Sequence, residues 1–553
     1  MTGTGGVLFE ALRRHRRWLF ALVVVALLAE MAVAMVTTAV EQTPTVDEPV
    51  YVASAVVYLQ EHSLRYNPEH PPLGKLIIAT GLAFSGARLD PAFVGSQGAA
   101  GQHLLYESGN DPWRLMLLAR LPMIVLTLLF GLVVFAFARD LVGPVGGLVA
   151  LALYTFSPDI ITNGSLATLD VPAAGFLLTS VWLLWRARRR PLLYLPLAGV
   201  ALGAAVATRM SALPAVPVLL LLVIVSVWYA GRHNNDEPWR RGTARLLGLG
   251  ALAALGVALV AVVVVWASYL AVDPRLRWVT PEDMPVIHGL RGLVVDWLPF
   301  PRPYRDGMRI QFGFEDTTFG GFLFGRRYVG PLWYYLPAAL LVKTPLGMLA
   351  LWLAGAVAMV SVPRLRSAAP YVLAPTALLL AAALNQSRDF GVRYAIFVPM
   401  FLAVGAATVV ALRWRWTHVA TSALVLFVAV SSLRTYPYYL PYSNEAFGGP
   451  SKTYLRLHDS NVDWGQDLGR LADHLKQRYP GEKVWLVYKG SGVPSYYGIN
   501  ASDPLKVSPN DVHGLLVVSD AWIDKASSQL MALIASSTPI DEVGHSMTIY
   551  RRS

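Results

Sequence analysis

The segment WLFALVVVALLAEMAVAMVTTAV, residues 18–40, is an apolar block that contains one charged residue, Glu30. A helix needs about 20 apolar residues to cross the hydrocarbon core of a bilayer, so this block predicts a membrane span. Similar blocks recur along the chain, whose 553 residues are 55% hydrophobic and 15% charged. A soluble protein carries about 25% charged residues. The sequence therefore predicts a polytopic α-helical membrane protein.

The residues just before this block, Arg13-Arg14-His15-Arg16-Arg17, are similar to the basic start of a secretory signal peptide. The block is longer than the apolar region of such a peptide, and no convincing cleavage site follows it. We therefore expect a retained first span. The chain has no cysteine, which excludes disulfides, a thiolate nucleophile and a thiolate metal site.

The hydrophobic pattern predicts eleven spans, at about 18–40, 115–138, 143–157, 169–187, 191–208, 212–230, 246–270, 344–362, 370–385, 394–412 and 417–433. With a cytoplasmic N-terminus, every basic cluster before or between the spans falls on the cytoplasmic side, as the positive-inside rule requires. These clusters contain Arg186, Arg188, Arg189, Arg190, Arg232, Arg240, Arg241, Arg245, Arg364, Arg366, Arg413 and Arg415. The formal charge of +11 is thus explained by topology, and we expect no nucleic-acid partner.

This topology leaves three long segments outside the membrane, at residues 41–113, 271–343 and 435–553. The first two are loops of a membrane domain that covers residues 1–434. The third has a soluble composition, with an amphipathic helical pattern followed by strand-like runs, at 463–479, 483–490, 514–520 and 545–552. We expect residues 435–553 to form a small extracytoplasmic α/β domain.

The first outer loop carries TVDEPVYVASAVVYLQEHSLRYNPEHPPLGK, residues 45–75. No nucleotide-sugar pool exists outside the cell, so chemistry there must use a membrane-borne donor, such as a polyprenyl-phosphate sugar. Transfer from this donor needs a carboxylate that takes the acceptor's hydroxyl proton and cations that hold the leaving phosphate. Asp47 or Glu48 can supply the carboxylate, and His70 and Lys75 can supply hydrogen-bond donors.

Pro49 suits the first helical position, so the acidic pair marks a helix start. Adjacent acids cannot point in the same direction, so we expect one to be catalytic and the other structural, and we favour Asp47 as the base. A simpler interpretation of the same residues is structural. An acid before proline is often a helix cap, and NPEHPP (67–72) is an ordinary rigid turn.

The combination of these motifs resembles a known family. DEPVYVASA (47–55) followed by NPEHPPLGK (67–75) is similar to the first outer loop of bacterial protein O-mannosyltransferase-like enzymes, which belong to the C-type glycosyltransferase superfamily. The family pattern pairs an acidic doublet with a histidine–proline–proline–leucine and lysine run. A further acid at the start of a span is matched by Asp170, and other segments that resemble bacterial members lie at 330–349, 389–401 and 459–468.

The resemblance implies a C-type glycosyltransferase fold and an inverting transfer of a sugar, with mannose favoured, from a polyprenyl-phosphate carrier. It implies Asp47 as the general base, with Glu48 and Asp170 also in the catalytic group. The acceptor is left open as a protein, a lipid or a cell-wall glycan. No segment is long enough for the β-trefoil domain of the eukaryotic enzymes. The expected location is the inner or plasma membrane of a bacterium, among membrane lipids.

Three further basic residues are candidates for binding the donor phosphate together with His70 and Lys75. Arg209 lies at an outer span end, where snorkelling to the interface is the alternative. Lys343 precedes an interfacial helix, where it could bind a phosphate or a lipid headgroup. Arg393 lies on a short outer loop beside Asp389, and a structural Asp389–Arg393 pair is the competing interpretation.

In the C-terminal segment, Asp463, Trp464 and Gln466 are candidates for acceptor binding, because a tryptophan beside polar amides can stack on a sugar ring. Helix capping explains the acid equally well. We expect no essential metal or other cofactor, although Asp47, Glu69 and His70 could in principle bind a divalent cation.

Two other classes of function are compatible with a polytopic membrane protein. A lipid-carrier flippase or transporter predicts internal repeats, broken spans and charges near the bilayer midplane. No repeat is evident, and the charges cluster at one interface. A binding or assembly protein would work through its C-terminal segment. Loss of turnover on Asp47→Asn, with carrier binding kept, separates the transferase from these alternatives.

Overall fold

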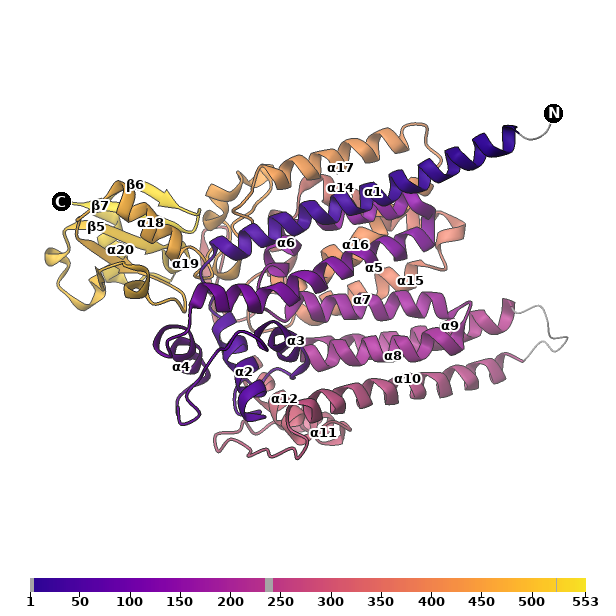
Figure 1. The fold of residues 1–553 in the computed structure, drawn as a ribbon, viewed down its shortest axis with the longest axis horizontal. Helices are drawn as coiled ribbons and strands as arrows, with labels where there is room; N and C mark the ends of the chain where they lie inside the picture. The colour runs from indigo at the N-terminus through magenta and orange to yellow at the C-terminus, as the bar shows by residue number, and fades with distance from the viewer. Residues whose placement is uncertain (1–3, 234–241, 524) are drawn as a thin grey trace.

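The computed structural model describes residues 4–233, 242–523 and 525–553, so Arg240 and Arg241 of the predicted basic clusters lie outside it. Long helices run side by side in a bundle, and an α/β region sits at one end of it (Figure 1). The bundle helices are α1 (Thr4–Glu41), α5 (Pro112–Thr155), α7 (Asp170–Ala187), α8 (Pro191–Thr208), α9 (Val216–His233), α10 (Thr243–Val272), α14 (Leu346–Ser361), α15 (Ala369–Ala383), α16 (Phe397–Ala406) and α17 (Thr417–Leu433).

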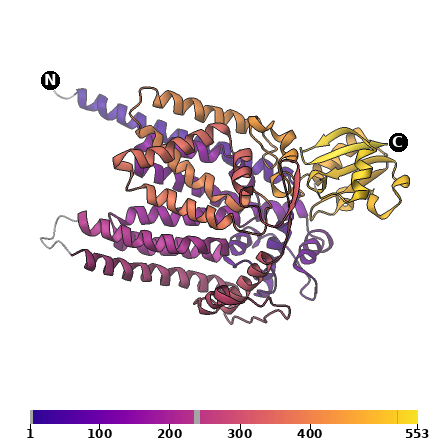
Figure 2. The same ribbon diagram turned by 180° about the vertical axis from the view of Figure 1, so that it is seen from behind.

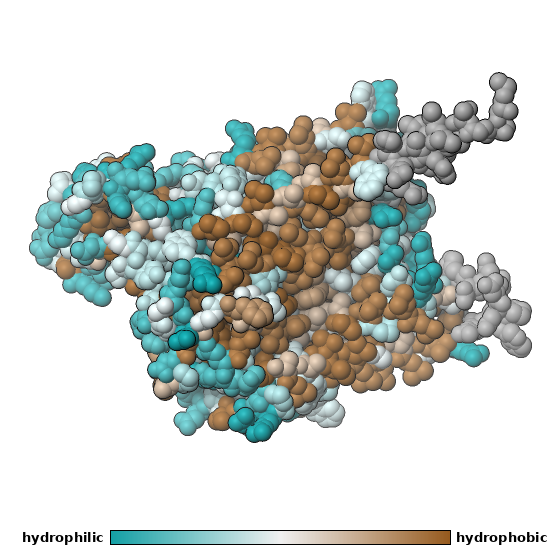
Figure 3. All heavy atoms as spheres, in the orientation of Figure 1, coloured by the Kyte–Doolittle hydropathy of each residue, from teal (hydrophilic) through white to brown (hydrophobic). Residues whose placement is uncertain are grey.

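Five helices in the described part of the chain are long and apolar enough to cross a membrane, or six if the bent pair α13 (Tyr335–Lys343) and α14 is one span. On the face drawn in Figure 3, apolar residues dominate the surface of the bundle, whereas hydrophilic residues gather around the α/β end. The protein is therefore a multi-pass membrane protein. Gly143 has non-helical backbone angles, φ 85° and ψ −177°, which divide α5 where the sequence predicts two spans. The count of eleven remains a prediction.

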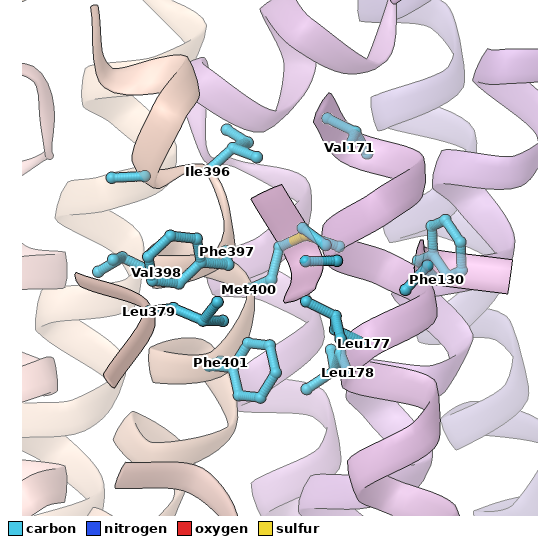
Figure 4. Close-up of a cluster of buried hydrophobic side chains, with 14 of the residues drawn as sticks. Phe130, Val171, Leu177, Leu178, Leu379, Ile396, Phe397, Val398, Met400 and Phe401 are labelled. Carbon is cyan, nitrogen blue, oxygen red and sulfur yellow. The ribbon is translucent and has the colours of Figure 1, made fainter. Parts of the chain in front are cut away.

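The bundle core is built from apolar side chains of several helices. Phe130 of α5, Leu177 of α7, Leu379 of α15 and Phe401 of α16 belong to one buried cluster (Figure 4). Helices α8 and α10 approach closely at Gly203, because a Cβ atom there would lie 2.7 Å from the carbonyl oxygen of Ala261. Small residues allow such close packing where lipid gives no hydrophobic drive between helices.

Both long loops lie at the end of the bundle that carries the α/β region (Figures 1 and 2). The first loop forms α2 (Glu48–Glu61), α3 (Leu73–Leu82), α4 (Gln97–Gln102) and the turn η1 (His103–Glu107). The second forms α11 (Gly289–Trp297), α12 (Arg302–Glu315) and a hairpin of β1 (Gly320–Leu323) and β2 (Arg326–Val329). The short helix α6 (Pro158–Gly164) precedes α7. The first described residues of α1 lie at the opposite end of the bundle.

The C-terminal segment folds around a five-stranded sheet with the order β4-β3-β5-β7-β6. The strands β3 (Val484–Val487), β4 (Ala501–Ser502) and β5 (Gly514–Ser519) are parallel, whereas β7 (Met547–Arg552) runs antiparallel to β5 and to β6 (Thr538–Val543). Helices α18 (Leu468–Arg478), α19 (Asp520–Ile523) and α20 (Ser528–Ala535) accompany the sheet.

The helix that the sequence predicts at 463–479 begins only at Leu468. Gly465 has φ +88°, in the left-handed region, so the backbone of 463–467 cannot continue the helix. These residues contact the first outer loop instead: Gln466 accepts a hydrogen bond from the backbone amide of Thr43 at 3.0 Å. The predicted start of this helix was therefore wrong, because tertiary hydrogen bonds replace its first turn.

Candidate active site

Asp47 lies at the N-terminus of α2, and Pro49 occupies the first turn of that helix, as the sequence predicts. The Asp47 carboxylate makes no capping hydrogen bond to α2. Its Oδ2 accepts a hydrogen bond from Nη1 of Arg393 at 2.8 Å, and the side chain keeps 30% of its surface exposed. Asp47 thus stands at the cap position of α2, but its side chain does not cap the helix and its carboxylate remains accessible.

Glu48, its neighbour, is completely buried and forms a two-point ion pair with Arg120. The Arg120 Nε and Nη2 atoms donate to the two carboxylate oxygens of Glu48 at 2.7 and 2.6 Å. The backbone amides of Thr45 and Ala167 donate to the same carboxylate at 2.9 and 2.8 Å. Burial opposes ionisation, but Arg120 and these amides outweigh it and lower the pKa of Glu48. Glu48 thus fits the structural role expected for one of the two acids.

Arg393 belongs to the short 3₁₀ helix η4 (Val392–Ala395), and its guanidinium lies close to two aromatic rings. Its guanidinium carbon is 4.3 Å from the centre of the Trp464 ring and 4.9 Å from that of Tyr394. Burial disfavours the charge, yet Tyr394 and Asp47 outweigh it and raise the pKa of Arg393 above its usual value. Arg393 is therefore a cation held against the Asp47 carboxylate.

Asp389 does not form the pair with Arg393 that the sequence allowed. Its Oδ2 accepts hydrogen bonds from the Tyr328 hydroxyl at 2.9 Å and from the Leu332 backbone amide at 3.0 Å. Arg393 is consequently free to reach Asp47, which is 346 residues away in the sequence.

A cavity of about 1010 Å³ joins these groups. The predicted site residues along its wall are Asp47, His70, Arg209, Arg393 and Trp464. Apolar side chains from α8, α10, α11 and α12 line another part of it, namely Leu202, Val206, Val262, Val294 and Phe312. The cavity therefore combines charged groups with an apolar surface, which suits a ligand with a charged head and a hydrocarbon tail.

His70 lines this cavity and has one nitrogen without a partner. The residue is half-buried, and its Nδ1 atom is buried with no hydrogen-bond partner in the described structure. Burial, together with the positive charges of Arg209 and Lys75, places the pKa of His70 well below its usual value. His70 is therefore a neutral hydrogen-bonding group and not a second cation.

Asp170 occupies the first turn of α7 and forms an ion pair with Arg209 at the end of α8. Leu169, and not Asp170, is the residue at the cap position, so capping does not explain the acid. Asp170 lines a small side cavity of about 50 Å³, which shares Arg209, Arg393 and Tyr394 with the main one. Asp170 therefore contacts the Arg209 guanidinium from the side cavity and does not line the main cavity.

Two predicted phosphate ligands do not reach the cavity. Lys75 is buried and donates to Asn67 O at 2.7 Å and to His70 O at 2.8 Å, so it holds the loop in shape. Burial lowers the pKa of Lys75 to about 7. Lys343 donates to the backbone carbonyls of Leu440 and Asn461. Local oxygen atoms therefore occupy the ammonium groups of both lysines, and their role as phosphate ligands stays a prediction that this geometry does not favour.

The C-terminal candidates are buried as well, and only Trp464 lines the cavity. Asp463 accepts hydrogen bonds from the Ser519 hydroxyl and from the Gly465 amide. The Gln466 side chain accepts one from the Trp464 amide at 2.7 Å. Asp463 and Gln466 therefore shape a turn, and their positions do not support contact with an acceptor.

The cavity also contains polar residues that the sequence did not single out for the site. Tyr51, Arg388, Tyr394, Asp459 and Lys489 lie on its wall. Tyr51 and Tyr394 follow the recognised motif residues closely, so sequence proximity could have indicated them. Lys489 enters from the loop after β3 and forms an ion pair with Asp459. No local pattern marks this lysine, because its position depends on how the sheet docks.

The arrangement places an accessible carboxylate, a paired guanidinium and a neutral imidazole around one space. Such a set can accept a proton at Asp47 and stabilise a phosphate with charge-assisted hydrogen bonds from Arg393 and Arg209. Among the described residues, no group of three histidine or acidic side chains could hold a metal ion.

Comparison with known protein families addresses the same part of the chain. Residues 23–273 match the dolichyl-phosphate-mannose-protein mannosyltransferase family. This match confirms the resemblance drawn from the sequence, and it covers the first outer loop with Asp47 and Glu48, as well as Asp170 and Arg209. The matched family consists of glycosyltransferases that its description links to dolichyl-phosphate mannose and to protein. A comparison with curated protein sequences gives no match.

Several solved structures are similar at low identity. ArnT from Cupriavidus metallidurans in the apo state is 16% identical over 95% of this chain and 97% of that chain, with a TM-score of 0.46. The S. cerevisiae protein O-mannosyltransferase Pmt1-Pmt2 complex bound to the sugar donor is 20% identical over 46% of this chain and 33% of that chain, with a TM-score of 0.36. The archaeal oligosaccharyltransferase AglB from Archaeoglobus fulgidus is 12% identical over 90% of this chain and 69% of that chain, with a TM-score of 0.43.

Proposed function

We propose that this protein transfers a sugar, with mannose favoured, from a polyprenyl-phosphate carrier to an acceptor hydroxyl at the outer face of a bacterial membrane. The observation that carries the proposal is the contact of an accessible carboxylate, Asp47, with the guanidinium of Arg393 inside a cavity that is part charged and part apolar. The matched family, whose description names a dolichyl-phosphate sugar, supports the donor class.

In the proposed reaction, the acceptor oxygen attacks the anomeric carbon and its proton passes to the Asp47 carboxylate. The bond between that carbon and the phosphate oxygen breaks, and its electron pair leaves with the phosphate. Attack opposite to the leaving group inverts the anomeric carbon. Arg393, Arg209 and neutral His70 stabilise the charge that develops on the phosphate. The phosphate is already a good leaving group, so the reaction needs no separate general acid.

The apolar part of the cavity would take the first isoprene units of the carrier. The chain of such a carrier stays in the bilayer, so the donor would enter sideways from the outer leaflet. The acceptor is proposed to be a protein, a lipid or a cell-wall glycan. In this orientation, the N-terminus is cytoplasmic and the C-terminal α/β region is extracytoplasmic.

The direct test uses the full-length protein in lipid nanodiscs with labelled polyprenyl-phosphate mannose and a cell-envelope extract. Acceptor-dependent movement of label from carrier to extract is the expected result. A flippase would instead move labelled carrier between the leaflets of a vesicle and leave the sugar–phosphate bond intact. Mass spectrometry of envelope material from a deletion strain would then identify the acceptor that loses a hexose.

Arg209→Gln is expected to weaken binding of polyprenyl phosphate about tenfold, because a charge-assisted hydrogen bond to the phosphate is lost. Titration of the lipid into nanodiscs measures this affinity. The double variant Asp170→Asn with Arg209→Gln serves as the control, since it removes the pair without leaving an unpaired acid. Recovery of binding in the double variant would show that Arg209 only neutralises Asp170.

Removal of divalent cations is expected to leave the transfer rate within about twofold, because Arg393 and Arg209 supply the positive charge that a metal would otherwise give the phosphate. Turnover is compared before and after EDTA treatment, and again after Mg²⁺ or Mn²⁺ is restored. Loss on chelation with recovery by one metal would contradict the proposed metal-free mechanism.

A further inference from the structure

The turn formed by residues 463–467 of the C-terminal segment is hydrogen-bonded to the loop that precedes Asp47. The backbone amide of Val46 donates to the carbonyl of Trp464 at 3.0 Å. The amide of Thr43 donates to the carbonyl of Gln466 at 3.0 Å, and the Ser491 hydroxyl donates to the carbonyl of Thr45 at 2.9 Å. The position of Trp464 is therefore fixed relative to the start of α2.

The Trp464 side chain is also held in place by packing. Only 2% of the residue is exposed, and it packs against Leu166 and Leu440. Its face lies against the guanidinium of Arg393, with 4.3 Å between the guanidinium carbon and the ring centre. A buried ring leaves little surface for stacking on an acceptor sugar. The ring instead provides a rigid wall for a cation, an arrangement that is favourable in a desolvated site.

The orientation of the Arg393 guanidinium depends on the neighbouring rings. Its Nε atom has no hydrogen-bond partner in the described structure, Nη1 donates to Asp47 at 2.8 Å, and Nη2 donates to the Tyr394 hydroxyl at 3.4 Å. The orientation of the guanidinium is therefore set by these two hydrogen bonds and by the rings of Trp464 and Tyr394. Arginine side chains have several rotatable bonds, so removing one ring releases alternative rotamers.

We infer that Trp464 is a positioning residue: its indole holds the guanidinium of Arg393 against the carboxylate of Asp47, so that the C-terminal segment completes the active site. The catalytic consequence rests on the proposed function. The geometric claim does not, and it can be tested without any substrate.

The chain has no cysteine, so Asp47→Cys introduces a single thiol whose reactivity reports its surroundings. A neighbouring guanidinium lowers the pKa of a thiol and increases the thiolate fraction at neutral pH. We expect Trp464→Leu in the Asp47→Cys background to raise this thiol pKa by about 1, and to slow alkylation by a water-soluble maleimide about fivefold at pH 7. The pH dependence of the alkylation rate gives the pKa.

The decisive comparison repeats the substitution without the arginine. In an Asp47→Cys, Arg393→Gln background, Trp464→Leu should change the thiol pKa no further, because the group through which it acts is gone. The other charged groups of the cavity are the same throughout the series, so their influence cancels; they are Glu69, Arg209, Arg291, Glu315, Arg388, Asp459 and Lys489.

Trp485→Leu is the matched control, since Trp485 is equally buried but lies in β3, where its indole donates to the His513 carbonyl. It should leave the thiol pKa unchanged. Trp464→Phe keeps an aromatic ring beside Arg393 and should give a thiol pKa between those of the parent and of Trp464→Leu. If Trp464→Leu does not fold, this second variant provides the test. An unchanged thiol pKa in a folded Trp464 variant, or an equal change with and without Arg393, would overturn the inference. Absence of sugar transfer in the wild type would refute only the proposed function.

Discussion

Asp47→Asn is expected to reduce sugar transfer by about 100- to 10,000-fold, the range that loss of a general base costs. Asparagine is nearly isosteric and can still accept the hydrogen bond from Arg393, so the cavity should keep its shape. Binding of polyprenyl phosphate should therefore stay within about threefold, since the variant loses proton acceptance and little else. Initial rates with labelled donor and lipid titration separate the two quantities.

Asp111→Asn is a suitable control, because this acid lies in the same outer loop and caps α5, a task that asparagine performs equally well. It should leave turnover unchanged. If Asp47→Asn retains the wild-type rate, Asp47 is not the base, and the flippase alternative gains support. If it abolishes carrier binding together with turnover, the carboxylate has a structural role that its exposed position does not indicate.

The fold could be predicted from the sequence wherever a local signal, such as apolar length or a helix-start proline, determines the structure by itself. Long apolar blocks identify the membrane helices, and proline before an apolar run marks the start of α2. The start of α18 was missed because residues 463–467 have an amphipathic helical pattern, yet Gly465 adopts a left-handed backbone. The carbonyls of Trp464, Gly465 and Gln466 accept hydrogen bonds from a loop more than 400 residues away. Local pattern cannot reveal a competing partner that distant.

The same limit applies to the site. Asp47, His70, Arg209 and Arg393 were recognisable because they occupy motifs at span ends, and the structure brings them around one cavity. Glu48, the other acid of the doublet, is buried against Arg120 instead. Lys75 and Lys343 carry the same charge in the same motifs, but backbone oxygens take up their ammonium groups. Charge alone is therefore a poor guide to which cations line the cavity, because nearby carbonyls can hold a lysine ammonium away from it.

Glu48→Leu is expected to destabilise the protein by about 3–5 kcal/mol, because it leaves the buried guanidinium of Arg120 without its carboxylate. It also removes the acceptor for the amides of Thr45 and Ala167, which then lack a partner. Arg120 additionally donates to the backbone carbonyls of Ala39 at the end of α1 and of Gln42 and Thr43 in the first loop, so the pair ties the end of α1 to the start of α2. Thermal and denaturant unfolding of the protein in detergent measure the change.

Glu61→Leu breaks a second acid–arginine pair in the same loop, between Glu61 and Arg65 at 2.8 Å, whose side chains are 19% and 29% exposed. Water can replace that partner, so the expected loss is below about 1 kcal/mol. The comparison isolates burial, since both substitutions remove one carboxylate from one arginine. Equal losses for the two variants would mean that the Glu48–Arg120 pair does not hold the loop. A large loss for Glu48→Leu alone would show that one acid of the doublet fixes the backbone from which the other reaches the cavity.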